Sequence, residues 1–336
     1  MQGMDRRQFG SIMLGLATTA GLDRLQVPDR VDMAHVRYIR ATIDRLYRQD
    51  QSLGGGALAQ SALRQYRRAR RMLNEADYSD RVGSELILAV GDLAVCVGWL
   101  CYDNGNQPLA RELYSDALLL ANQSRNDELS VRVLEKMALQ SVFVTWNGNA
   151  RIGAEAVRLA QGAADLSRRS PHAQLHALIA GREAIGRAIV GDERGFERAI
   201  ARARNEIDRS DPSDDVPVWL QFVNHSEIDV HEARGKLFLG DATASVELFS
   251  ASLDNQLLSQ RNRANYQAQL AASLARSGDV STALNEGSRA LSILEGQVIS
   301  PRTLIELQAV REMAQEQGDE EFCVRHDLVV SGMTRM

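Results

Sequence analysis

The residues nearest to a chemical pattern in this sequence are its histidines. His172 and His176 are four residues apart, so on a helix they would share one face at a spacing typical of metal ligands. Pro171 places His172 at the start of that helix, and no third ligand follows at a fixed spacing. The pair therefore does not predict a metal site.

A second pair, His225 and His231, lies close to Asp229 and Glu232 and is equally incomplete as a ligand set. Ser226 is adjacent to His225, but adjacency does not direct one side chain at the other, and no Gly-x-Ser-x-Gly pattern surrounds it. No catalytic residue, metal or cofactor is predicted.

The cysteines and glycines also lack the spacing of a reactive site. Cys96 and Cys101 are five residues apart and diverge on a helix, so we interpret them as buried structural thiols. Three cysteines without a C-x-x-C motif do not support a disulfide scaffold and favour a reducing, cytoplasmic setting. Gly54-Gly55-Gly56 follows a predicted helix and has no Lys-Ser/Thr after it, which argues against a phosphate-binding loop.

The charge of the chain limits its partners. The net charge is −5 over 336 residues, whereas nucleic-acid-binding domains are normally basic on at least one face. The arginines between Arg64 and Arg71 make one helix face basic, and we interpret that face as solvated. Sequence-specific DNA binding by this chain alone is not expected.

Helices must position these residues, and the stretch from Gly91 to Asn122 is the clearest case. It predicts two antiparallel helices, because Gly105 ends the first, Pro108 can begin the second, and apolar residues recur at helical spacing. The residues that match the tetratricopeptide pattern are Gly98, Ala110, Tyr114 and Ala117. Ala94 and Cys101 stand where that pattern usually has Trp and Tyr.

The glycine turn recurs along the chain. The turns lie 38 to 49 residues apart, at Gly105, Gly148, Gly191, Gly240 and Gly278. The predicted fold class is therefore all-α: a tetratricopeptide-like helical-hairpin solenoid of about seven helix pairs. The expected helices span 31–51, 58–76, 85–104, 108–122, 128–146, 151–166, 171–190, 194–207, 218–239, 242–257, 264–277, 280–294, 303–317 and 320–329.

Two units are predicted: an N-terminal arm or docking helix over 1–30 and the repeat array over 31–332. Arg6 and Arg7 before an apolar run admit two interpretations, a twin-arginine export signal or an amphipathic helix that docks on the array or a partner. The run is too short to span a membrane, and no membrane association is expected. The acidic loop 210–217, with two prolines, is the predicted joint.

The first helix of each pair lines the concave side of such arrays and forms the natural binding groove. The predicted partner-binding residues are Trp99, Tyr102, Asp103, Val142, Trp146, Ile185, Arg234 and Asn265. Aromatic rings beside Asp, Arg and Asn suit an extended peptide. The alternative is that Trp99 and Trp146 pack between pairs. Trp219, beyond the acidic loop, is not assigned to the groove.

Several short segments carry a family resemblance. They are Gly98-Trp-Leu-Cys-Tyr-Asp-Asn-Gly105, the stretch 46–55, Arg182-Glu183-Ala184, Gly278-Asp279-Val280 and Ser300-Pro301-Arg302. Over nearly the whole chain the sequence resembles the tetratricopeptide-repeat sensory half of actinobacterial helix-turn-helix regulators of the Xre type. No Xre-type helix-turn-helix precedes the repeats in this sequence, so DNA binding is not carried over.

The resemblance implies a cytoplasmic regulatory repeat protein that binds a peptide or protein partner in its groove and acts on transcription or specialised metabolism. The alternative is an enzyme of specialised metabolism built on the same array. A homodimer is also expected, because an array exposes its last pair unless something covers it. The apolar terminal residues behind this expectation are Leu14, Leu16, Phe322, Leu328 and Val329.

Overall fold

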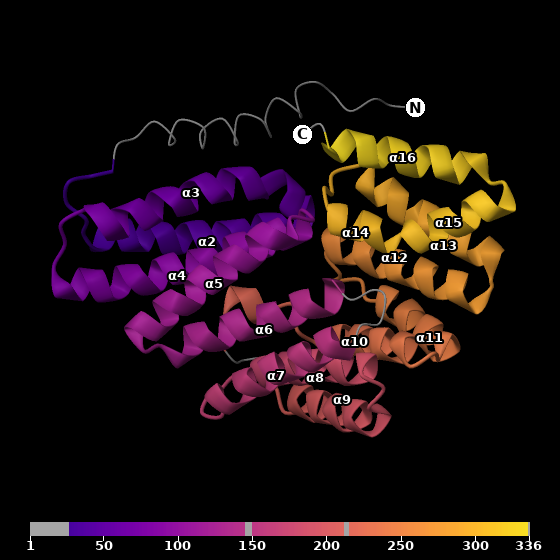
Figure 1. The fold of residues 1–336 in the computed structure, drawn as a ribbon, viewed down its shortest axis with the longest axis horizontal. Coiled ribbons are helices and arrows are strands. Elements are labelled where there is room, and N and C mark those ends of the chain that lie inside the picture. Colours follow the sequence, from indigo (N-terminus) through magenta and orange to yellow (C-terminus); the bar gives the residue numbers. More distant parts are fainter. Residues whose placement is uncertain (1–26, 145–149, 212–214, 335–336) are drawn as a thin grey trace.

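The computed structural model describes residues 27–144, 150–211 and 215–334, and these ranges contain fifteen α-helices, one short 3-10 helix and no strand (Figure 1). The chain is all-α, as predicted. The helices are α2 (Met33–Leu53), α3 (Gly55–Glu75), α4 (Asp80–Asp103), α5 (Gln107–Ser124), α6 (Asp127–Val144), α7 (Ala150–Leu166), α8 (Ala173–Ile189), α9 (Glu193–Asp208), η2 (Val218–Leu220), α10 (His225–Phe238), α11 (Ala242–Leu253), α12 (Gln260–Ser277), α13 (Val280–Leu294), α14 (Pro301–Glu306), α15 (Gln308–Gln317) and α16 (Glu320–Thr334).

Several helix pairs are joined by a turn of two or three residues that contains the same Gly-Asn or Gly-Asp pair. A glycine with φ between 74° and 89° ends one helix, and the Asn or Asp after it caps the next by accepting from a backbone N–H three residues on. These turns are Gly105-Asn106, Gly191-Asp192, Gly240-Asp241, Gly278-Asp279 and Gly318-Asp319. Four of the five predicted turn glycines are confirmed, and the fifth, Gly148, lies outside the described residues.

The helices pack in sequence order. Within the described ranges α4 packs on α5, α6 on α7, α8 on α9, α10 on α11 and α12 on α13. The first helices α2, α4, α6, α8 and α10 also contact one another in succession. Glycines allow neighbouring helices to approach closely, because they have no side chain. The ring of Tyr114 lies against Gly98, and the ring of Phe196 lies against Gly235. Gly98 and Tyr114, two of the residues that match the tetratricopeptide pattern, are therefore in contact.

The row of helices curves until its two ends meet (Figure 1). Helices α2 and α4, at the beginning, contact α12 and α14, near the end. Two backbone hydrogen bonds join the ends: Ile299 N donates to Leu53 O, and Gly56 N donates to Ile299 O, each with a donor–acceptor distance of 2.8 Å. Helices near the beginning of the chain therefore pack directly on helices near its end.

Asp103, at the end of α4, lies at the centre of this closure and is fully buried. Its carboxylate accepts hydrogen bonds from Gly55 N at 2.8 Å, Ser300 Oγ at 2.9 Å and Arg302 Nε at 3.0 Å. One side chain thus holds together segments almost 200 residues apart in sequence.

Two segments that were each predicted as one helix are divided in the structure. The helix predicted over 218–239 is divided into η2 and α10, because Asn224 caps a new helix by accepting from Glu227 N at 3.2 Å. The helix predicted over 303–317 is interrupted at Leu307, whose N–H bonds to Leu304 O at 3.1 Å and whose side chain is fully buried. The chain bends at both points.

The start of α12 also differs from the prediction. It begins at Gln260, four residues before the predicted Ala264, because the Ser259 hydroxyl accepts from Asn262 N at 3.2 Å and caps the helix. This extra turn carries Arg261 and Asn262.

The terminal apolar residues are only partly exposed. Phe322 and Val329, predicted to be exposed, are buried, because α16 packs them into the core with α13 and α15, whereas Leu328 is 67% exposed. Leu14 and Leu16 lie outside the described residues. Among the described helices, α4 alone is long and apolar enough to cross a membrane, and it is mostly buried between its neighbours, as a core helix is.

Candidate ligand-binding cavity

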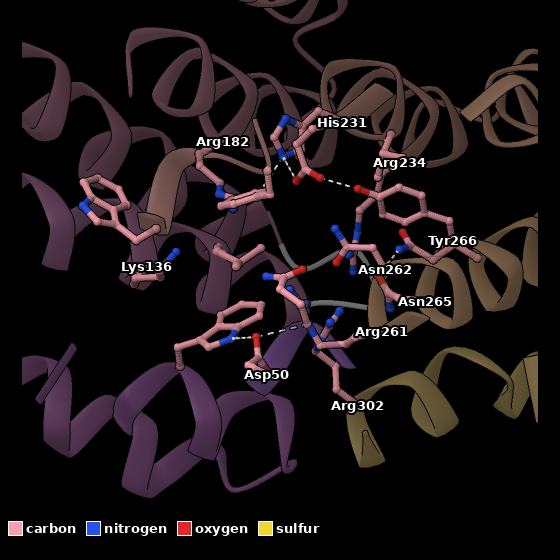
Figure 2. Close-up of a pocket in the computed structure, with 18 of the residues that line it drawn as sticks. Asp50, Lys136, Arg182, His231, Arg234, Arg261, Asn262, Asn265, Tyr266 and Arg302 are labelled. Carbon is pink, nitrogen blue, oxygen red and sulfur yellow. Dashed lines mark hydrogen bonds and ion pairs between the residues drawn. The ribbon is translucent and has the colours of Figure 1, made fainter. Parts of the chain in front are cut away.

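The first helices enclose a cavity of about 80 Å³, called the inner cavity here (Figure 2). Its lining comes from α2, α4, α6, α8, α10, α12 and α14, together with residues 218–222. Polar and charged side chains from helices far apart in sequence point at a common space (Figure 2). The closure of the row is therefore what creates the cavity.

Four of the predicted partner-binding residues line the inner cavity: Trp99, Ile185, Arg234 and Asn265. Tyr102 and Asp103 are buried and do not line it. Val142 packs in an apolar cluster with Ile185, and Trp146 lies outside the described residues.

Trp219 was not assigned to the groove, and this is corrected by the structure. The segment after the acidic loop turns inward at η2, so Trp219 lines the inner cavity with Val218 and Phe222. The Arg132 guanidinium lies 4.8 Å from the centre of the Trp219 ring.

Trp99 is the aromatic centre of the inner cavity. Its Nε1 donates to Asp50 Oδ2 at 2.9 Å. Three cations lie near the ring: Arg261 at 4.9 Å from its centre, Lys136 at 5.2 Å and Arg302 at 5.8 Å. These are cation–π distances, which favour a positive charge over the indole face.

Each cation of the lining has an acidic partner. The pairs are Lys136 with Glu135 (2.7 Å), Arg182 with Glu135 (3.7 Å), Arg234 with Glu306 (3.2 Å), Arg261 with Asp50 (3.1 Å) and Arg302 with Asp103 (3.0 Å). All of these side chains are at most 6% exposed. Burial lowers the pKa of Lys136, and repulsion from Arg182 contributes, although Glu135 opposes the shift.

His231 is a neutral member of this network. Burial, followed by repulsion from Arg182 and Arg234, lowers its pKa well below 6.5. The neutral ring accepts a hydrogen bond at Nε2 from Arg182 Nη1, 2.7 Å away. Glu227 lies 3.4 Å from the same nitrogen. Burial raises the pKa of Glu227, which accepts a hydrogen bond from the Tyr266 hydroxyl.

Helix α12 presents a row of amides to the inner cavity. Asn262, Asn265 and Gln269 all line it, and Gln51 of α2 lines it too. Gln269 Nε2 donates to Asn265 Oδ1 at 2.7 Å. The other polar atoms of this pair, Asn265 Nδ2 and Gln269 Oε1, are buried and have no hydrogen-bond partner among the described residues. This pair therefore presents one free donor and one free acceptor.

A second space, called the outer pocket here, adjoins the inner cavity and has a volume of about 320 Å³. The residues shared by the two are Tyr47, Gln51, Val218, Phe222, Asn262 and Tyr266. Leu257, on the outer pocket alone, is 93% exposed. The inner cavity is thus adjacent to an opening on the surface.

The histidine and cysteine patterns do not assemble into a site. His172 precedes α8 instead of sharing its face with His176, and His225 is exposed whereas His231 is buried. No group of three side chains that could hold a metal ion occurs in the described part of the chain. Cys101 is a buried free thiol whose pKa is raised to about 11 by burial.

Most of the charged lining was not recognised from the sequence. Lys136 and Arg261 were not singled out, and Arg182 and Arg302 appeared only within segments of family resemblance. The usable signal is a charged residue inside an apolar helix. In α8, Arg182 and Glu183 are surrounded by Ala, Gly, Leu and Ile, so these charges must face one another or an internal space.

No protein-family model matches this chain, and a search of curated proteins found no match either.

Proposed function

We propose that this chain is a tetratricopeptide-like helical-hairpin solenoid of about seven pairs that acts as a cytoplasmic regulatory receptor. In this proposal it binds a short peptide, or one end of a protein partner, in the inner cavity and the outer pocket. It would thereby control transcription or specialised metabolism, as the resemblance to Xre-type sensory regions implies. The chain alone would not bind DNA sequence-specifically.

The observation that carries this proposal is the amide row of α12. A peptide backbone offers one N–H donor and one C=O acceptor per residue. Asn265 Nδ2 and Gln269 Oε1 supply the complementary donor and acceptor, and both are buried without a partner among the described residues. A buried polar atom without a partner costs about 1–3 kcal/mol, which a bound backbone would recover.

The dimensions favour a short ligand. The outer pocket of about 320 Å³ and the inner cavity of about 80 Å³ share six lining residues. A ligand pocket typically has about 300–1,000 Å³, so the two together suit a few residues of extended peptide rather than a folded domain.

The proposal is tested by affinity selection from a pool of random hexapeptides with the full chain, followed by mass spectrometry and calorimetry of the enriched peptides. Asn265→Ala is expected to weaken binding of an enriched peptide by about 10-fold, since it removes a buried hydrogen bond. Gln123→Ala, which removes an exposed amide on α5, is the matched control and should bind normally. Failure to enrich any peptide would refute the proposal.

An enzyme on the same array is the second candidate, and one observation favours it. Glu227 lies in the inner cavity with a raised pKa, beside His231 and Tyr266. Carboxyl groups with raised pKa values are typical of general acids. Chemical conversion of an enriched ligand by the wild-type chain, lost in Glu227→Gln, would establish this candidate over the receptor.

A further inference from the structure

The charges that line the inner cavity are unequal in number. Five cations line it: Lys136, Arg182, Arg234, Arg261 and Arg302. From the described residues only two acids, Asp50 and Glu227, share that lining. The acids Asp103, Glu135 and Glu306 pair with the cations but do not line the cavity. The charged side chains that face the cavity are therefore mostly cationic, although each cation is paired with an acid.

Arg261 and Arg302 both lie over Trp99 and pair with acids through Nε. Among the described residues, no hydrogen bond reaches the terminal guanidinium nitrogens of either arginine. These nitrogens form a planar fork whose geometry matches a carboxylate. Repulsion between neighbouring cations also favours an anion placed among them.

The volume limits how much of a ligand can enter. A buried water needs about 10–15 Å³ on the scale used for such cavities, so about 80 Å³ corresponds to about six water-sized atoms. The C-terminal residue of a peptide, with its two carboxylate oxygens and a small side chain, has about this number of non-hydrogen atoms. A longer anionic group, or an internal acidic side chain with its flanking backbone, would exceed the space.

We propose that the inner cavity binds the C-terminal carboxylate of the peptide ligand, while the preceding residues occupy the outer pocket. The carboxylate accepts hydrogen bonds from the terminal nitrogens of Arg261 and Arg302, and the amides of Asn265 and Gln269 hold the adjoining backbone. This inference rests on the proposed function and specifies which end of the peptide enters first.

The test compares two pools of random, N-terminally acetylated hexapeptides on the full chain. One pool has a free C-terminal carboxylate and the other has a C-terminal amide, so they differ in one group. Individual peptides enriched from the acid pool should bind about 10- to 100-fold more tightly than their amidated counterparts, as expected for a charge-assisted bidentate contact.

Equal affinity for the acid and amide forms would overturn this inference and leave the peptide receptor standing. Enrichment from neither pool would refute the receptor and this inference together. The two failures are therefore distinguishable.

A double variant links the preference to the cavity. Asp50→Asn with Arg261→Gln removes both charges of one ion pair and keeps an acceptor for Trp99 Nε1. It should reduce the acid-over-amide preference about 10-fold, whereas Arg71→Gln with Glu75→Gln, an exposed pair on α3, should not change it. A folded cavity variant that keeps the full preference would contradict the assignment. If this variant does not fold, the wild-type comparison of acid and amide forms still decides.

Discussion

An arginine faces an acid both in the inner cavity and on the outer surface. The pKa of the acid is shifted in opposite directions in the two settings. Burial raises the pKa of Asp50 although Arg261 lies 3.1 Å away. Hydrogen bonding from Arg311 lowers the pKa of Asp327, whose side chain is 53% exposed. Hydration accounts for the difference. On the surface the acid stays hydrated, so the arginine has the larger effect on its pKa; in the interior the loss of hydration has a larger effect than the arginine.

The comparison shows that the interior charges are costly to bury. Pairs such as Asp50 with Arg261 are therefore weak evidence for stability, although removing one partner alone would be more costly still. The outer pairs, by contrast, change the free energy of unfolding little, whether they are present or removed. If the interior charges bind a ligand, variants in the interior should change unfolding free energy and peptide binding, whereas variants on the surface should change neither.

The largest effect is expected at the closure. Asp103→Ala would leave Arg302 buried without its acid and remove three hydrogen bonds, so the free energy of unfolding should fall by about 3–5 kcal/mol. Urea unfolding followed by circular dichroism measures this loss. The outer counterpart, Asp327→Ala, should leave the midpoint unchanged, and similar losses in both variants would contradict the distinction between interior and surface pairs.

The next effect concerns Trp99. Trp99→Ala removes a ring that packs against the core and lies near three cations. We expect the free energy of unfolding to fall by about 3 kcal/mol and peptide binding to weaken. Tyr38→Ala, at a 47% exposed aromatic on α2, is the control. Unchanged affinity in the folded fraction would mean that Trp99 is a packing residue only.

A smaller effect is expected from pH at His231, which faces Arg182, Arg234 and Glu227. Its folded-state pKa lies well below the unfolded value of 6.5. Below pH 6.5 the unfolded chain therefore binds a proton that the folded chain does not, and stability falls by about 1.4 kcal/mol per pH unit until the folded pKa is reached.

His231→Gln should remove this part of the pH dependence, as measured by urea unfolding between pH 7.5 and about 5. His225→Gln, at an exposed histidine on the same helix, should retain it. A steep acid loss that persists in His231→Gln would place the titrating group elsewhere.

The smallest effect is expected on the outer basic face of α3. Arg70 pairs with Asp116 and Arg71 with Glu75, so these two pairs reduce the positive charge that the face offers to nucleic acid. The chain alone should show at most weak, salt-sensitive association with DNA. A gel-shift complex that survives moderate salt and competitor DNA would contradict this expectation.

The local part of the fold could be predicted from the sequence. Gly105 and Asn106 illustrate why: a glycine that adopts a positive φ and an Asn that caps the next helix act within a few residues, so a short segment contains the whole signal. The contact between Gly98 and Tyr114 was accessible for the same reason.

The closure and most of the inner cavity could not be predicted in this way. Asp103 meets Ser300 and Arg302 across almost 200 residues, and no periodic pattern encodes how far a row of helices curves. The first turn of α12 was not predicted, because it contains the polar residues Arg261 and Asn262. The spacing of apolar residues alone places the start of this helix later. The interior residues that were predicted correctly, because first helices face inward, are Trp99, Ile185, Arg234 and Asn265.

The closure also has an evolutionary consequence. Open rows of helix pairs can gain or lose a pair by duplication or deletion, because each pair contacts only its neighbours. Here the beginning of the chain must reach Ile299, Ser300 and Arg302, so one pair more or fewer would carry those residues away from Leu53 and Asp103. The number of pairs is therefore fixed by geometry, and this lineage should vary by substitution within the pairs and by changes in loop length rather than by changes in repeat number.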